Sequence, residues 1–441
     1  MKRFNIITLV LTFGSILFSV MLQAQFELIG NYRVRSEFAD GYKQPLMKGQ
    51  EPGFYIHQGA ILGAKYKHER FHFTFSVNDI RTWGSTSYDG IEKGGFFSIR
   101  EANVAVIFNK NWQLKVGRQQ LKYDNERIFS PSGWGMQGIR HDAAILKFNY
   151  NDWKLDIGGA YNQNANSNIQ TFYTLNQYKT FQYAWVNKKW NSLSASIIFL
   201  NNGVEQTYFN QDSIEKKRTN FTQTMGSHLE FTKEKYGITL FGYYQMGMTP
   251  TRQVLSAFDL SLEANYKPIK GLSFALGGEV LSGTSQLMTA NNRNYSYQTL
   301  HSTRHSFNGY MDYFYSGNHQ NSVGLIDAYF KLGYKFKQFH FKIDNHAFFS
   351  HREIMDLNAM DPLATHHPYL GYEMDFTFIY QMIDEVAIQA GYSFMLGTKA
   401  LRDLKGVNQT KLQNWAYIMI TVQPFKNLKI KGIEKKEKED L

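Results

Sequence analysis

Seven of the charged side chains in one stretch of the sequence, residues 98–148, are arginines and acids, the types that bind carboxylates or form ion pairs. They are Arg100, Arg118, Asp124, Glu126, Arg127, Arg140 and Asp142. A guanidinium group presents a planar fork of donors that matches a carboxylate. The cluster can therefore form a constriction that holds an anion as it passes, or a network that ties a loop to a wall. Because opposite charges here can satisfy each other, the sequence leaves both interpretations open.

The elements that position this cluster show a period of two residues. In "QFHFKIDNHAFF", residues 338–349, Phe341 and Ile343 share one parity, whereas Lys342 and Asp344 share the other. Successive side chains of a β-strand point to opposite faces, so this pattern predicts a strand between an apolar and a polar medium. The same alternation recurs in residues 26–38, 71–78, 152–164, 370–380 and 386–396.

The connections between these strands alternate in length. Short polar turns are predicted at 67–70, 109–111, 149–152, 187–189, 232–235, 267–270, 335–338 and 382–385, and longer links at 38–56, 82–95, 124–138, 201–221, 283–322 and 350–368. Short turns at one end and long loops at the other are typical of an outer-membrane barrel. We therefore predict an all-β fold, a transmembrane antiparallel up-and-down β-barrel of about 18 strands. The strands near Phe181, Thr222 and Ala257 have the weakest pattern, which leaves 16 strands as the alternative.

The two ends of the chain differ from the barrel region. Lys2 and Arg3 precede an apolar run that ends near Ala24, which is the pattern of a secretory signal peptide. A membrane anchor is the other interpretation of this run. We expect a signal peptide over residues 1–24, the barrel over 25–423 and a charged periplasmic tail over 424–441. The net charge of +11 is spread along the chain, so we expect no nucleic-acid partner.

Two stretches resemble the alginate-export family of outer-membrane proteins. The first, residues 98–148, matches that family's pattern at Arg100, Ala102, Gly117, Arg118, Gln119, Leu121, Tyr123, Glu126, Arg127, Trp134, Arg140, Asp142 and Ala143. The second, "HSFNGYMDYF" at residues 305–314, is similar to a downstream signature of the family, and His141 departs from the expected aromatic residue. The resemblance implies a barrel whose lumen passes an acidic polysaccharide or, in distant members, other small anions.

The expected substrate-binding residues of the pore combine this cluster with charges on the polar faces of strands. They are Arg33, Arg35, Arg100, Lys115, Arg118, Glu126, Arg127, Arg140 and Asp142. Positive and negative lumen charges are close to balanced, so any preference for anions must come from local groups of charge. Arg118 is at odds with this assignment, because it shares the parity of the lipid-facing Leu114 and Val116 unless a bulge or a strand end intervenes.

Other functions receive less support from the sequence. A barrel-borne hydrolase would need a nucleophile, a histidine and an acid to converge, but Ser130 has no nucleophile motif and His141 and Asp142 point to opposite faces. A structural or adhesive barrel is a further alternative. The pairs His366–His367 and His301–His305 lack the spacing of a metal site. We expect a monomeric passive channel without catalytic residues, cofactor or metal, with lipid, an anionic solute and the barrel-assembly machinery as partners.

Overall fold

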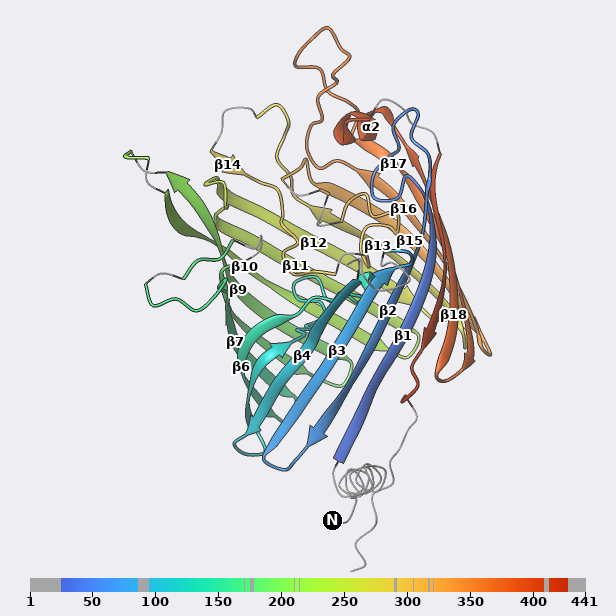
Figure 1. The fold of residues 1–441 in the computed structure, drawn as a ribbon. Coiled ribbons are helices and arrows are strands. Elements are labelled where there is room, and N and C mark those ends of the chain that lie inside the picture. Colours follow the sequence, from blue (N-terminus) through green and yellow to red (C-terminus); the bar gives the residue numbers. More distant parts are fainter. Residues whose placement is uncertain are drawn as a thin grey trace, which may run out of the picture.

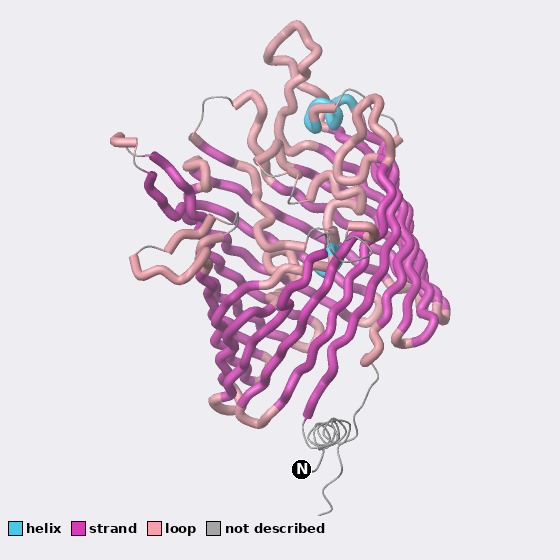
Figure 2. Tube along the Cα trace, in the orientation of Figure 1, coloured by secondary structure: helices cyan, strands magenta, loops and turns pink. Residues whose placement is uncertain are grey.

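The computed structural model describes residues 25–85, 95–169, 171–174, 178–209, 211–213, 215–288, 292–303, 305–315, 318–319, 321–407 and 412–426. Within them the chain forms one closed β-barrel, with tight turns at one end and long loops at the other (Figures 1 and 2). None of the helices in these residues is long and apolar enough to cross a membrane. The expected signal peptide and most of the expected tail lie outside the described residues.

The strands follow one another around the wall in chain order. They are β1 (Gln25–Asp40), β2 (Gly53–Lys67), β3 (Phe71–Thr82), β4 (Gly95–Ile107), β5 (Trp112–Gln119), β6 (His141–Tyr150), β7 (Trp153–Tyr161), β8 (Thr180–Lys189), β9 (Leu193–Phe209), β10 (Glu215–Lys233), β11 (Tyr236–Met248), β12 (Val254–Tyr266), β13 (Leu272–Leu281), β14 (Arg293–Asn294), β15 (Leu325–Phe336), β16 (Phe339–Phe349), β17 (Tyr369–Ile383), β18 (Val386–Gly397) and β19 (Gln413–Val422). A 3₁₀ turn, η1 (Gly133–Gly135), and one helix, α2 (Lys399–Lys405), lie in the loops.

The barrel closes by antiparallel pairing of its first and last strands. β1 pairs with β19 from Tyr32 opposite Val422 to Asp40 opposite Asn414. The two-residue β14 only adds a short parallel pairing to β12, and β13 pairs directly with β15. Eighteen strands therefore form the wall, so the predicted fold is confirmed, including the weakly patterned strands β8, β10 and β12. Closure leaves no strand edge without a partner, as a wall in lipid requires.

The two faces of the wall differ as the alternation predicts. In β16, Asp344 and His346 are buried inside the barrel, whereas Phe341 is 48% exposed on the outside. Leu276, Leu62 and Ile197 are exposed on other strands in the same way. An apolar outer surface around a polar interior is the arrangement of a membrane-spanning barrel.

One predicted loop is largely strand. The link expected over residues 201–221 is occupied by the ends of β9 and β10, which pair from Leu193 opposite Phe231 to Phe209 opposite Glu215. The ladder hydrogen bonds continue beyond the apolar part of the strands, because a polar sequence can still pair where both faces are wet. These two strands therefore project beyond their neighbours at the long-loop end (Figure 1).

Two long loops fold into the lumen and carry much of the buried apolar surface. Loop 120–140 contributes Phe129, which is fully buried. The connection between β13 and β15 contributes Met311 and Tyr313, also fully buried, in a stretch we call the plug segment, residues 305–315. A single barrel wall has no opposing sheet, so the interior packing comes from these loops.

Candidate functional site: the filled lumen

Loop 120–140 is fixed to the opposite wall by a buried ion pair. Arg127 lies 2.8 Å from Asp259 on β12 and 2.8 Å from Glu279 on β13, and none of the three side chains is more than 3% exposed. Burial alone would lower the pKa of Arg127, but the Glu279 and Asp259 carboxylates raise it above its ordinary value. The guanidinium therefore stays charged, and its role is to hold the loop across the lumen.

The plug segment contains the second family-like motif and docks onto carboxylates of the wall. The backbone N–H groups of Met311 and Tyr310 donate to Glu373 (2.7 Å) and Asp375 (3.3 Å) on β17. Gly309, at φ 81°, lies so close to the wall that an added Cβ would be 2.3 Å from the Glu373 Oε1 atom. Only glycine combines this backbone conformation with this close approach at low cost.

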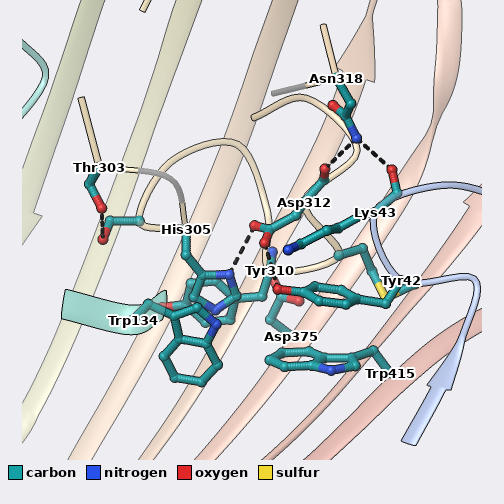
Figure 3. Close-up of polar contacts among 12 residues, drawn as sticks. Tyr42, Lys43, Trp134, Thr303, His305, Tyr310, Asp312, Asn318, Asp375 and Trp415 are labelled. Atoms are coloured by element: carbon teal, nitrogen blue, oxygen red, sulfur yellow. Dashed lines mark hydrogen bonds and ion pairs between the residues drawn. The ribbon is translucent and has the colours of Figure 1, made fainter. Parts of the chain in front are cut away.

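Aromatic rings join the two inward loops. The ring of Trp134, in loop 120–140, stacks on His305 in the plug segment at 4.2 Å, and His305 stacks in turn on Tyr310 (Figure 3). The Arg35 guanidinium also lies over the Trp134 ring, with its Cζ atom 4.0 Å from the ring centroid. The ring of Trp134 therefore has two contacts within the protein, one with each of these side chains.

A histidine–aspartate–tyrosine chain completes this joint. His305 Nδ1 lies 2.9 Å from Asp312 Oδ1, and the Tyr42 hydroxyl donates to Asp312 Oδ2 at 2.7 Å (Figure 3). Tyr42 stacks on Trp415 of β19 at 4.7 Å. Three of the motif residues, His305, Asp312 and Tyr310, thus build the plug and its contacts with the wall.

The acidic side of the lumen spans β12 to β17 and is covered. Its carboxylates are Asp259, Glu279, Asp327, Asp344, Glu373 and Asp375, none more than 3% exposed. Besides the contacts above, Asn308 of the plug donates to Glu279 (2.6 Å) and Asp327 (3.3 Å). His346 and Lys342 on β16 pair with Asp327 and Asp344. We call this group the acidic wall.

The basic side of the lumen spans β1 to β6, and several of its charges remain partly exposed. Arg33 on β1 and Lys115 on β5 are half-buried, and neither forms an ion pair within the described part of the chain. Arg140 is half-buried at the start of β6, and Lys43, just beyond β1, is exposed. We call these four residues the basic side.

Two cavities lie on either side of the plug segment. The outer one, about 430 Å³, is lined by Lys43, Arg140, Trp134 and the plug residues Asp312 and Tyr315. The inner one, about 280 Å³, is lined by Ser306–Tyr310 of the plug and by wall residues of β11 to β16. His301 also lines the outer cavity, but burial holds its pKa well below the ordinary range. The positive charge of the outer cavity therefore comes from Lys43 and Arg140.

Two of the expected pore residues lie outside the lumen. Arg118 pairs in register with Asp142, and its Nε and Nη2 atoms donate to that carboxylate at 2.9 and 2.8 Å. Gln119 and His141, their chain neighbours, are the buried inward residues. No bulge moves Arg118 inward; it lies on the outer face, close to the long-loop ends of β5 and β6, where its charge is matched by Asp142. The structure therefore does not bring this pair to the constriction.

Three other predicted residues have structural contacts. Arg35 bonds Glu37 (2.7 Å) and the Trp134 carbonyl oxygen (3.0 Å). Arg100, the extra residue of a bulge in β4, donates to the carbonyl oxygens of residues 136 and 137. Glu126 accepts hydrogen bonds from Ser130 (2.6 Å) and Lys122 within its own loop. Of the two interpretations of the charge cluster, the loop-to-wall network describes Arg100 and Arg127, whereas these contacts of Glu126 stay within the loop.

The residues of the alternative hydrolase do not converge. Ser130 donates to Glu126, and His141 Nδ1 lies 2.8 Å from the Tyr178 hydroxyl. Asp142 is on the opposite face of β6, bonded to Arg118.

Lys43 is a cavity residue that the sequence does not predict, since a lone lysine after a strand carries no pattern. Its backbone N–H donates to the Met311 carbonyl oxygen at 2.8 Å, a contact that depends on the plug being inside the barrel.

The fold resembles solved porin structures, with little sequence identity. Acinetobacter baumannii OccAB1 has a TM-score of 0.61 at 12% identity, over 91% of this chain and 97% of that one. Pseudomonas aeruginosa OccK9 (OpdG) gives 0.59 at 10% identity, over 90% and 97%. Pseudomonas aeruginosa OpdK, solved with vanillate, gives 0.56 at 10% identity, over 90% and 98%. No family model and no curated protein matches the sequence.

These likenesses are to outer-membrane porins and do not single out the alginate-export family. A closed wall of 18 strands, apolar outside and polar inside, is that of an outer-membrane barrel of Gram-negative bacteria. The protein is therefore located in the outer membrane.

Proposed function

We propose that the protein is a channel for the passive passage of small organic anions across the outer membrane. The observation that supports this most is the unequal exposure of lumen charges. The acidic wall is covered by Arg127 and the plug segment, whereas Lys43 and Arg140 face the outer cavity. Although the formal charges nearly balance, the outer cavity is lined by two positive side chains, Lys43 and Arg140, against one carboxylate, Asp312. The carboxylates of Glu263, Glu279, Asp327 and Asp344 line the inner cavity instead, so a solute meets a mainly positive field in the outer cavity.

The size of the cavities favours a small solute. A cavity of about 430 Å³ is in the range that holds a single small molecule, and the plug segment separates it from the inner cavity. OpdK, of similar fold, was solved with vanillate, a small aromatic carboxylate, which agrees with a solute of this size. The Trp134 ring already contacts His305 and Arg35, so charge, rather than ring stacking, would select the solute here.

Ion selectivity in a planar bilayer tests this function. In a salt gradient, the wild-type reversal potential should show that chloride passes more readily than potassium. The double variant Lys43→Gln/Arg140→Gln should lower the anion-to-cation permeability ratio by about two- to fivefold, as expected for charges worth up to ~1 kcal/mol in water. The matched control is Arg118→Gln, which also removes one arginine of the first motif but on the outer face.

Two results would contradict the proposal. If the wild-type channel is non-selective or prefers cations, the anion function is wrong. If Arg118→Gln changes the permeability ratio as much as the double variant does, the outer cavity does not set the selectivity.

Export of an acidic polysaccharide is a second candidate, favoured by the motifs that resemble the alginate-export family. A polymer would need the plug segment to leave the lumen, since it lies between the two cavities. Block of the ion current separates the candidates. Vanillate or a single uronic acid should block at lower concentration than a uronate polymer if the solute is small, and at higher concentration if the solute is the polymer.

We also propose that the channel is a monomer, because the barrel of one chain closes on itself.

A further inference from the structure

A cluster of metal-ligand side chains lies outside the barrel, above its long-loop end. It combines Asp356 and His366, from the loop between β16 and β17, with Asp403 of α2. The three ligand atoms lie within 4.8 Å of one another, and no other group of three or more such residues in the described ranges meets this condition. In the sequence, His366 and His367 have no acidic residue at the spacing of a metal site, because the two acids come from other positions in the chain.

A hairpin and the helix α2 bring the three side chains close to one another. Residues 354–366 form a small hairpin, in which Met355 bridges Thr365 and the Asp356 N–H donates to the Ala364 carbonyl oxygen at 2.9 Å. The hairpin rises beside α2 (Figure 1). The helix begins after Thr398, whose side chain caps the Leu401 N–H, and ends at Gly406 in the left-handed conformation. These caps fix a helix of only two turns and with it the position of Asp403.

The distances suit a tetrahedral cation. His366 Nε2 lies 2.7 Å from Asp403 Oδ2 and 3.8 Å from Asp356 Oδ1. Metal–ligand bonds of about 2.0–2.2 Å in tetrahedral geometry place ligand atoms about 3.3 Å apart. The two distances from His366 lie on either side of this value, and the Asp356 and Asp403 carboxylate oxygens lie within 4.8 Å of each other. Small side-chain movements would therefore bring the three atoms around one ion.

Charge and burial also point to a cation. The His366 and Asp403 side chains are 10% and 9% exposed, and that of Asp356 is 32% exposed. Two carboxylates face one imidazole, and Arg402 lies 3.6 Å from the far oxygen of Asp403. The half-exposed Asp356 leaves a side from which an ion and a water ligand can enter.

We propose that Asp356, His366 and Asp403 form a site for a transition-metal dication of the zinc type. The imidazole nitrogen decides the class, because Ca²⁺ and Mg²⁺ are bound by oxygen ligands, whereas Zn²⁺ takes nitrogen together with carboxylate oxygen. Three protein ligands leave the fourth position for water. The occupied site would fasten the hairpin to α2.

The proposed metal site also affects the pore, because α2 contacts the plug segment. Lys405, two residues after Asp403, donates to the carbonyl oxygens of Tyr313 (2.5 Å) and Asn318 (3.2 Å). A metal ion that holds α2 against the hairpin therefore restricts the motion of α2. Because Lys405 of α2 binds the plug segment, the motion of the plug is restricted as well. We expect Zn²⁺ to reduce the open–closed fluctuations of the channel without changing its ion selectivity.

Metal binding to the purified, EDTA-stripped protein in detergent tests the site. Calorimetry should show one Zn²⁺ bound per chain at micromolar concentration, and Co²⁺ should give the visible absorption of a tetrahedral site. His366→Gln and Asp403→Asn should each weaken Zn²⁺ binding at least tenfold. The matched control is His367→Gln, the exposed neighbouring histidine, whose Nδ1 accepts the Tyr369 N–H and which should leave binding unchanged.

Three results would overturn the proposal. They are no Zn²⁺ binding by wild-type protein that still conducts in the bilayer, equal weakening by His367→Gln, and Ca²⁺ binding as tight as that of Zn²⁺. Single-channel conductance of each variant in EDTA shows whether its barrel has formed. Because the site lies outside the pore, its loss leaves anion selectivity intact, so its failure and that of the channel function are distinguishable.

Discussion

The two sides of the lumen carry opposite charges and use them differently. The acidic wall on β12 to β17 is a docking surface: Arg127 and the plug segment bind its carboxylates, which are buried. On the basic side, Lys43 and Arg140 line the outer cavity, and Arg33 and Lys115 are only half-buried. The carboxylates of the acidic wall thus hold the inward loops, whereas Lys43 and Arg140 face the outer cavity.

This difference explains why counting charges along the strands does not predict selectivity. A buried carboxylate without a partner costs several kcal/mol, so the inward loops must supply donors wherever the acidic wall is dry. Once they do, that wall is neutralised locally. The basic side meets water, which screens its charges without cancelling them. The comparison predicts that uncovering the acidic wall should reverse the preference for anions.

The largest effect is expected from Arg127→Gln. This change leaves Asp259 and Glu279 buried without their guanidinium, which should destabilise the protein by about 3–5 kcal/mol. Water should then enter beside the loop, and the reversal potential should shift toward cation preference. Denaturant unfolding in detergent and bilayer recordings measure the two effects.

The control for Arg127→Gln removes the two carboxylates, of Asp259 and Glu279, that lose their partner in this variant. Adding Asp259→Asn and Glu279→Gln should recover most of the stability and the anion preference, because no uncompensated carboxylate remains. If Arg127→Gln alone leaves both the unfolding midpoint and the selectivity unchanged, the loop does not neutralise the acidic wall.

A smaller effect is expected from Gly309→Ala in the plug segment. Alanine at φ 81° costs about 1 kcal/mol, and its Cβ would meet the Glu373 carboxylate. The plug should move away from the wall, which raises the mean conductance and current noise. Gly49→Ala is the matched control: its φ is +89°, yet nothing lies within 4 Å of the added Cβ. Equal conductance changes in the two variants would show that backbone strain alone, not contact with the wall, is responsible.

The sequence predicted the wall far better than the contents of the lumen. Alternation over eleven residues of β16 reports a solvent on each side, which is a local property of the strand. The same parity predicts that Arg118 faces outward, and the structure places it there without a bulge, near the end of β5. The interior depends on pairs such as Arg127 with Asp259, 132 residues apart, which have no local periodicity. The motif at residues 305–314 marked the plug but not the surface that it docks on.

The smallest effect concerns pH and the contact between α2 and the plug. Burial lowers the pKa of Lys405 to about 7, below its ordinary value of 10.5. The amine is therefore neutral and its burial inexpensive at high pH. This stabilisation is lost as the pH falls from 10.5 to about 7, because in this range the released amine binds a proton and the buried amine does not. The plug should be held less firmly at pH 6 than at pH 9, which more frequent open–closed transitions in the bilayer would reveal.

Other titrating groups can be separated from Lys405 in this experiment. His319 lies nearby, but burial lowers its pKa to about 3, so it stays neutral at both pH 6 and pH 9. Lys405→Met keeps the length of the side chain without the amine, and in this variant the difference in transition frequency between the two pH values should disappear. If the transition frequency of Lys405→Met still differs between pH 6 and pH 9, other titrating groups determine how firmly the plug is held. The histidine–carboxylate pairs of the acidic wall would then be the next groups to test.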